Sequence, residues 1–233
     1  MSKQPVSEQI RYKLVRDGVR FFANDNISKY VNDKERVELI EELTGKFEGV
    51  LDTLLIDRAN DPNSKGTAKR LAKMYINEIM SGRYDLPPEV TAFPNDDPSE
   101  RYGGMIVTRA ELTSMCSHHH QTVKGVAYIG LLAGVRVIGL SKYARVAQWL
   151  AMRGTLQEEL TKMIADEIQK HTGTPDMAVY VQATHGCCEN RGIRSHSSLT
   201  QTCELRGQFF NPSVKNEFLD YIKMQQQFAN SRS

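Results

Sequence analysis

Two stretches in the first hundred residues carry apolar side chains at helical spacing. Between residues 33 and 57 the apolar positions recur three or four apart, which places them on one face of a helix. A turn-forming cluster at 60–66 separates this stretch from a second helix, predicted to begin at Thr67. Residues 84–100 contain four prolines and are expected to form an extended connector.

After Met105 the pattern changes to runs rich in β-branched and aromatic residues, which are typical of strands. Strands are predicted at 105–112, 123–132, 135–140, 176–185 and 197–210. Helical spacing predicts helices at 141–153, 156–171 and 213–227. A strand pair, a helix pair, a second strand pair and a closing helix predict an α+β fold, with an antiparallel four-stranded sheet and two helices on one face.

These patterns predict three parts of the chain. Residues 1–32 form a polar N-terminal segment with few apolar positions, which is a candidate for partial disorder. Residues 33–100 hold the N-terminal helices and the connector, and residues 101–233 are expected to form the α+β domain. The N-terminal helices are therefore expected to be an addition to the sheet-containing unit.

Composition narrows the class of protein. The 233 residues are 40% apolar and 25% charged, which is ordinary for a globular domain. A net charge of +2 gives no argument for nucleic acid or a membrane surface as a partner. The sequence has no apolar run long enough to span a membrane, and its N-terminus lacks the apolar core of a signal peptide. We expect a cytoplasmic protein, in which clustered Cys and His indicate metal binding or catalysis rather than disulfides.

The strongest chemical signal is the stretch TSMCSHHHQTVKG at 113–125, which holds three of the six histidines of the chain. A Cys-x-x-His spacing can bring Sγ and a ring nitrogen to one ion if the backbone turns. The distant stretch THGCCENRG at 184–192 offers His185, Cys187 and Cys188. Together the two stretches could supply three ligands and leave a fourth position for water, as in catalytic zinc sites.

The three histidines cannot all serve one ion if the segment is extended. Side chains alternate along an extended chain, so His118 and His119 would point to opposite sides. One of them would then be free for proton transfer. The competing interpretation treats the two stretches as unrelated polar loops with a core cysteine. It explains less well why three consecutive histidines occur together with a distant pair of cysteines.

Two further stretches indicate a nucleotide. In GLSKYARV at 139–146, Ser141 is a suitable N-cap, and Lys142 and Arg145 lie in the first turns of the predicted helix. Cations oppose the dipole at a helix start, so their presence there favours a bound phosphate, although a solvated basic face is an equal alternative. In TLQEEL at 155–160, a carboxylate could accept two N–H groups of guanine, although helix capping also explains an acidic residue there.

Taken together, these stretches resemble the GTP cyclohydrolase I family, the type I enzymes of the tunnelling fold. The resemblance runs from about Val50 to Asp220. It is strongest in NDPNSKGTAKRLAKMY, TSMCSHHH, VIGLSKYARV, LQEELT and ATHGCCENRG, and the order of these motifs makes it far more specific than any one of them.

The resemblance implies a zinc ion held by Cys116, His119 and Cys187. It implies catalytic roles for three further residues: His118 is the histidine that does not bind zinc, His185 donates a proton to the purine N7, and Ser141 lies near the ribose. Guanine would contact Gln157 and Glu158. The triphosphate would contact Lys142, Arg145 and Arg191, with Arg70 and Lys73 reaching in from a neighbouring subunit.

The implied reaction converts GTP and water to 7,8-dihydroneopterin triphosphate and formate. The implied assembly is a homo-oligomer, a decamer of stacked pentamers with sites at subunit boundaries. The sequence departs from the family at Ser117, which replaces a glutamate, and at His120, where an apolar residue is usual. Two alternatives are a tunnelling-fold enzyme acting on a related purine or pterin, and a non-catalytic zinc-bound scaffold.

Overall fold

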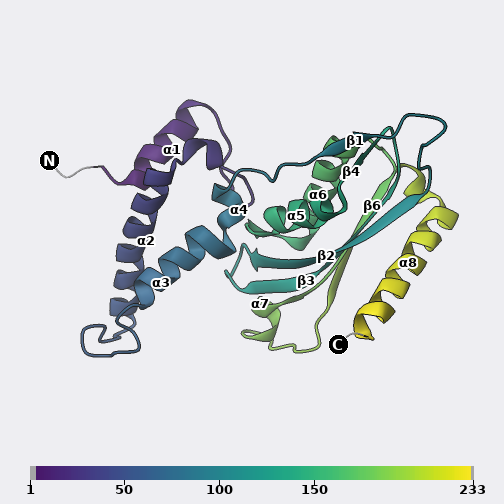
Figure 1. Cartoon of the computed structure of the whole chain (residues 1–233). Coiled ribbons are helices and arrows are strands. Elements are labelled where there is room, and N and C mark those ends of the chain that lie inside the picture. Colours follow the sequence, from purple (N-terminus) through teal and green to yellow (C-terminus); the bar gives the residue numbers. More distant parts are fainter. Residues whose placement is uncertain (1–3, 232–233) are drawn as a thin grey trace. The chain divides into compact units, whose positions relative to one another are not determined.

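The computed structural model describes residues 4–231 and forms two compact units, divided between Leu86 and Pro87. Figure 1 shows the helices of the first unit and the sheet-containing second unit. No helix within the described range is both long enough and apolar enough to cross a membrane.

The first unit is helical. Its elements are α1 (Val6–Arg16), the 3-10 turn η1 (Ser28–Tyr30), α2 (Asp33–Thr53), α3 (Thr67–Met74), the π-helical turn η2 (Tyr75–Ile79) and α4 (Ser81–Tyr84). Helix α2 begins with a reciprocal capping box. The Asn32 side chain accepts from the Glu35 amide at 2.9 Å, and the Glu35 carboxylate accepts from the Asn32 amide at 3.1 Å.

The N-terminal segment differs from the expectation of a polar, partly disordered stretch at 1–32. Within its described part, α1 buries Val6, Ile10 and Leu14 in a small cluster together with Ile27. Three buried apolar positions, each four residues apart, carry this helix. They pack against side chains farther along the chain, among them Leu39 and Tyr84, and these tertiary contacts stabilise the helix.

The second unit contains the sheet. Its strands are β1 (Ala92–Pro94), β2 (Met105–Cys116), β3 (Thr122–Leu132), β4 (Arg136–Ile138), β5 (Gly154–Thr155), β6 (Met177–His185) and β7 (Thr200–Arg206). Its helices are α5 (Leu140–Ala151), α6 (Gln157–Thr172), α7 (Gly186–Glu189), the 3-10 turn η3 (Gly207–Phe210) and α8 (Pro212–Asn230).

The main sheet has the strand order β5-β2-β3-β6-β7. The four long strands pair antiparallel, as expected, and β5 adds a two-residue parallel pairing with the end of β2. The strand predicted at 135–140 does not join this sheet. Its central residues form β4, which pairs with β1 in a separate two-stranded ribbon.

Helices cover both faces of the sheet (Figure 1). On one face α5 and α6 pack Val146, Leu150, Ile164 and Ile168 against the strands. On the other face α8 and the preceding turn contribute Phe209, Phe218 and Ile222. The expected pair of helices on one face is therefore present, and the closing helix covers the opposite face.

Candidate metal centre and adjacent histidine

The first cysteine of the candidate site lies at the end of β2, where the chain turns into β3. The Cys116 amide donates to the Gln121 carbonyl at 2.9 Å, and the His120 amide donates to the Cys116 carbonyl at 2.9 Å. These two bonds close a tight turn that contains the three histidines. Strand β2 is fixed on both sides here, because β5 pairs with Met115 and Cys116.

Sheet pairing brings the second cysteine stretch to the same place. In the β3–β6 ladder, His185 lies opposite Val123, just after the histidine turn. The chain then enters the short helix α7, which carries Cys187. Cys116 and Cys187 thereby join one small cluster with Val123 and Ala183.

Cys116, His119 and Cys187 each offer a ligand atom, and these atoms lie within 4.8 Å of one another. Two thiols and an imidazole are a donor set that suits zinc, and three protein ligands leave room for a fourth. Burial and the neighbouring Cys116 thiol raise the pKa of Cys187 to about 11. Metal binding at this group would therefore have to displace thiol protons.

The turn decides which histidine joins the cysteines. We expected side chains to alternate along an extended segment, but residues 117–119 form a turn and His120 has a left-handed backbone with φ of 50°. The alternation argument is therefore wrong for this segment. His119 still lies in the cysteine group, and the ring of His118 stands edge-on to it with the centroids 6.2 Å apart.

Beside this group, His185 is tied to the start of α6. Its Nε2 lies 2.8 Å from the Gln157 side-chain oxygen. Burial lowers the pKa of His185, while the carboxylates of Glu158 and Glu189 act in the opposite direction. Glu158 is thus close enough to influence the imidazole, and its side chain is exposed.

Gln157 does not present its side chain to a ligand. It is 5% exposed, and its amide nitrogen donates to the carbonyls of Val181 and Thr200, each at 3.1 Å, and to Thr202 Oγ1 at 3.2 Å. With its oxygen on His185, both ends of the side-chain amide have partners inside the chain. The sequence pattern gave no signal for this role or for the effect of Glu189 on His185.

The basic residues of α5 lie away from the cysteine group. The helix runs toward that group, because Gln148 bonds to the backbone of Thr113 and the chain continues into β5, beside Cys116. Lys142 stands nine residues before the helix end, a rise of about 14 Å. Its Nζ donates to the Glu89 carbonyl at 2.8 Å.

The remaining expected substrate contacts are exposed. Helix α5 begins at Leu140 with Gly139 as its N-cap, so Ser141 is not the cap that we expected but an exposed residue of the first turn. Arg145 is exposed on the same helix, and Arg191 is exposed in the loop after α7. Arg70 and Lys73 are exposed on α3 of the first unit.

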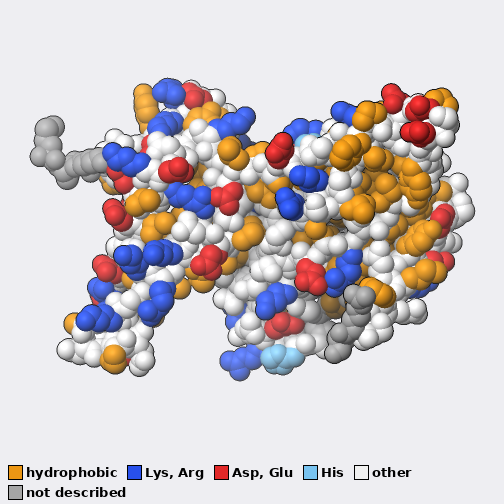
Figure 2. All heavy atoms as spheres, in the orientation of Figure 1, with side chains coloured by type: hydrophobic (Ala, Val, Ile, Leu, Met, Phe, Trp, Pro, Cys, Tyr) orange, Lys and Arg blue, Asp and Glu red, His pale blue; other side chains and the backbone are white. Residues whose placement is uncertain are grey.

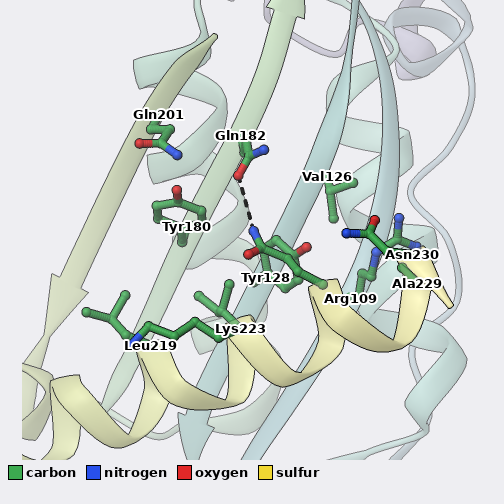
Figure 3. A pocket seen from close by; sticks show the side chains of 12 residues that line it. Arg109, Val126, Tyr128, Tyr180, Gln182, Gln201, Leu219, Lys223, Ala229 and Asn230 are labelled. Carbon is green, nitrogen blue, oxygen red and sulfur yellow. Dashed lines mark hydrogen bonds between the residues drawn. The ribbon is translucent and has the colours of Figure 1, made fainter.

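A separate cavity of about 550 Å³ lies on the opposite face of the sheet, under α8. Figure 3 shows residues that line it, among them Tyr128, Tyr180 and Gln182 on the strands and Lys223 on the helix. None of the residues expected in the site lines this cavity. The candidate chemistry is therefore confined to the end of the sheet where β2 and β6 terminate.

Fold and site together define an α+β protein with a candidate Cys–His–Cys metal centre beside a histidine. The profile of the family described as GTP cyclohydrolase I matches residues 44–223. The chain is 39% identical over 200 residues to GTP cyclohydrolase 1 of Flavobacterium johnsoniae, covering 85% of this chain and 86% of that protein. It is 37% identical over 200 residues to the protein of the same name from Aeromonas salmonicida, covering 84% and 88%. The chain belongs to the GTP cyclohydrolase I family, which confirms the resemblance.

Proposed function

We propose that this protein is a zinc-dependent GTP cyclohydrolase I, which hydrolyses GTP at C8 and rearranges it to 7,8-dihydroneopterin triphosphate and formate. The observation that carries the proposal is the convergence of Cys116, His119 and Cys187 beside His185, in a chain of this family. These residues come from separate stretches that only the sheet pairing brings together. A scaffold would not need a titratable histidine held beside its metal ligands.

The donor set supports zinc as the metal. A zinc ion held by three protein ligands supplies Lewis-acid activation of water at neutral pH. The chain's own residues would do the rest. His185 would protonate N7 of guanine, and this makes C8 more electrophilic. His118, which stands beside His119 but outside the cysteine group, would serve as a second proton-transfer group.

Recognition of guanine is assigned to Glu158, because it is exposed and lies near His185. A carboxylate can accept hydrogen bonds from both N1–H and the 2-amino group of guanine. The implied contact between guanine and Gln157 stays a prediction, since both ends of that side-chain amide already have partners within the chain. Ser141 remains the proposed residue near the ribose.

The triphosphate is assigned to Lys142, Arg145 and Arg191, with Arg70 and Lys73 supplied by another subunit. Lys142 lies about 14 Å back along α5 from the cysteine-proximal end of the helix. Phosphate would be held by charge-assisted hydrogen bonds from these side chains.

Open strand edges support a homo-oligomer. Within residues 4–231, β7 has a strand neighbour on one side only, and β2 is paired by β5 only at its last two residues. Figure 2 shows hydrophobic side chains gathered between β1 and α8, and this unit exposes Phe93, Tyr102 and Phe210. Unpaired edges and exposed apolar side chains favour association, and we propose the tunnelling-fold decamer of stacked pentamers.

The direct test is incubation of the purified protein with GTP while formate and pterin fluorescence are followed. We expect one formate for each pterin formed, and loss of both signals after metal chelation. Release of neither product would contradict the proposal. Consumption of GTP without formate would indicate a different reaction on a purine or pterin.

The two adjacent cysteines give a matched test of the metal centre. Cys187→Ala is expected to reduce bound zinc from about one per chain to a small fraction, because two ligands hold zinc poorly. Cys188→Ala should keep the metal, since only Cys187 lies in the ligand group. Elemental analysis of both variants measures this. The reverse result would reassign the ligand to Cys188.

Glu158→Gln is expected to raise the KM for GTP about tenfold to a hundredfold. The substitution places a donor opposite the guanine N–H groups, and an unpaired polar group costs roughly 1–3 kcal/mol. Steady-state kinetics measure the change. Glu159→Gln, at the next and equally exposed position, is the control and should keep the wild-type KM. Equal kinetics for the two variants would leave Glu158 as a residue of the helix start only.

A mixing experiment tests the shared site. Arg70→Ala and Arg145→Ala are each expected to raise the KM for GTP about tenfold or more, since a charged hydrogen bond contributes roughly 1.5–3 kcal/mol. Subunits of the two variants, dissociated and reassembled together, should regain part of the activity through sites that contain neither substitution. Activity no greater than that of the separate variants would place both arginines on one subunit's site.

A further inference from the structure

The hydrogen bonds around Gln157 determine which nitrogen of His185 carries hydrogen. The amide nitrogen of Gln157 faces two backbone carbonyls, Val181 and Thr200, which can only accept. The opposite orientation of the amide would set its oxygen against both carbonyls. The group that faces His185 at 2.8 Å is therefore the amide oxygen.

An amide oxygen can only accept a hydrogen bond, so Nε2 of His185 must be the donor. Nε2–H is then occupied by Gln157 whether the ring is neutral or charged. Within the described part of the chain, Nδ1 has no hydrogen-bond partner. Nδ1 is the ring atom left to contact a ligand.

Packing alone does not hold the imidazole in place. His185 is half-buried, and a small void beside it is lined by Leu112, Ser114, Val123 and Gly125. Gln157, by contrast, is buried and anchored at once to β6 and β7. The glutamine amide is therefore the rigid element, and the imidazole is the element that it orients.

We propose that Gln157 is a positioning residue, whose amide oxygen accepts a hydrogen bond from Nε2 of His185 and thereby fixes the orientation of the imidazole toward the substrate. This inference rests on the proposed function for the identity of the substrate. It differs from the role implied by the resemblance, in which Gln157 contacts guanine itself. The two roles have different kinetic consequences.

The test compares Gln157→Met with the wild type, since methionine has a similar length and removes both hydrogen-bonding groups. If Gln157 positions His185, Gln157→Met is expected to lower kcat about 10- to 100-fold. This loss is part of the rate enhancement that a positioned acid–base group contributes. The KM for GTP should stay within about twofold. The preference for GTP over inosine triphosphate, which lacks the 2-amino group, should not change.

Thr161→Val is the matched control for lost stability. Thr161 lies one turn further along α6 and is as buried as Gln157. Its replacement by valine removes the hydrogen bonds to the Gln157 carbonyl and to Thr202 Oγ1, but leaves the hydrogen bond between Gln157 and His185 in place. We expect it to unfold at a lower temperature but to keep the wild-type kcat per folded chain. An equal loss of kcat in both variants would overturn the proposal in favour of a structural role.

Two further outcomes decide the matter. A raised KM with an altered preference between GTP and inosine triphosphate would assign Gln157 to guanine and overturn the proposal. Crystal structures give a readout that needs no activity, because the His185 ring should turn or lose order in Gln157→Met and keep its orientation in Thr161→Val. An unchanged ring in Gln157→Met would overturn the proposal. If the wild type released no formate, the proposed function would fail. The crystal structures of the two variants would still test whether Gln157 orients His185.

Discussion

Replacing His119 by alanine is expected to remove both the metal and the activity. His119 supplies the one nitrogen among the three ligand atoms that lie within 4.8 Å of one another, and its loss leaves two thiols. A bound metal contributes several kcal/mol to catalysis, so the rate of formate release should fall about 1,000-fold or more. Elemental analysis and the formate assay on the same preparation measure both effects.

His120→Asn is the control for this variant. His120 is exposed in the same turn and has a positive φ, which asparagine tolerates better than most residues. The control should keep about one zinc per chain and the wild-type rate. Full zinc in His119→Ala would show that the metal is held by a different set of residues.

His118→Ala is expected to keep zinc and to lose kcat about 100-fold or more. The His118 ring lies against that of His119 but does not belong to the cysteine group, so metal binding does not depend on it. A loss of this size is usual for a group that transfers protons in the transition state. Zinc content and kcat, measured together, separate this outcome from metal loss.

The opposite pattern would be equally informative. A metal-free His118→Ala would exchange the roles of His118 and His119. A variant with full zinc and wild-type kcat would remove His118 from the proposed chemistry and leave His185 as the only acid–base histidine.

Local patterns in the sequence determined most of the secondary structure. The helices at α2, α3, α5, α6 and α8 and the four long strands follow from apolar spacing, because each depends on residues a few positions apart. The same patterns failed where long-range partners decide the outcome. Helix α1 buries only three apolar positions, and β4 pairs with β1 rather than with the main sheet.

The sequence also determined which residue types form the site, through two Cys/His stretches and the order of the family's motifs. Apart from the match to the family's motifs, residue spacing alone could not decide between adjacent residues. The choice of His119 depends on a turn closed by Cys116 and Gln121, and the choice of Cys187 depends on α7 following the paired end of β6. In such turns the backbone geometry sets the direction of each side chain, and the spacing of residues along the sequence does not determine it.

Only the tertiary structure revealed the contacts that Gln157 makes. In the sequence it is a polar residue at a helix start beside Glu158, and the resemblance implies that it contacts guanine. In the fold its amide meets the carbonyls of β6 and β7, which lie 24 and 43 positions away along the chain. A hydrogen bond forms wherever folding brings donor and acceptor together, so separation in sequence carries no signal of it.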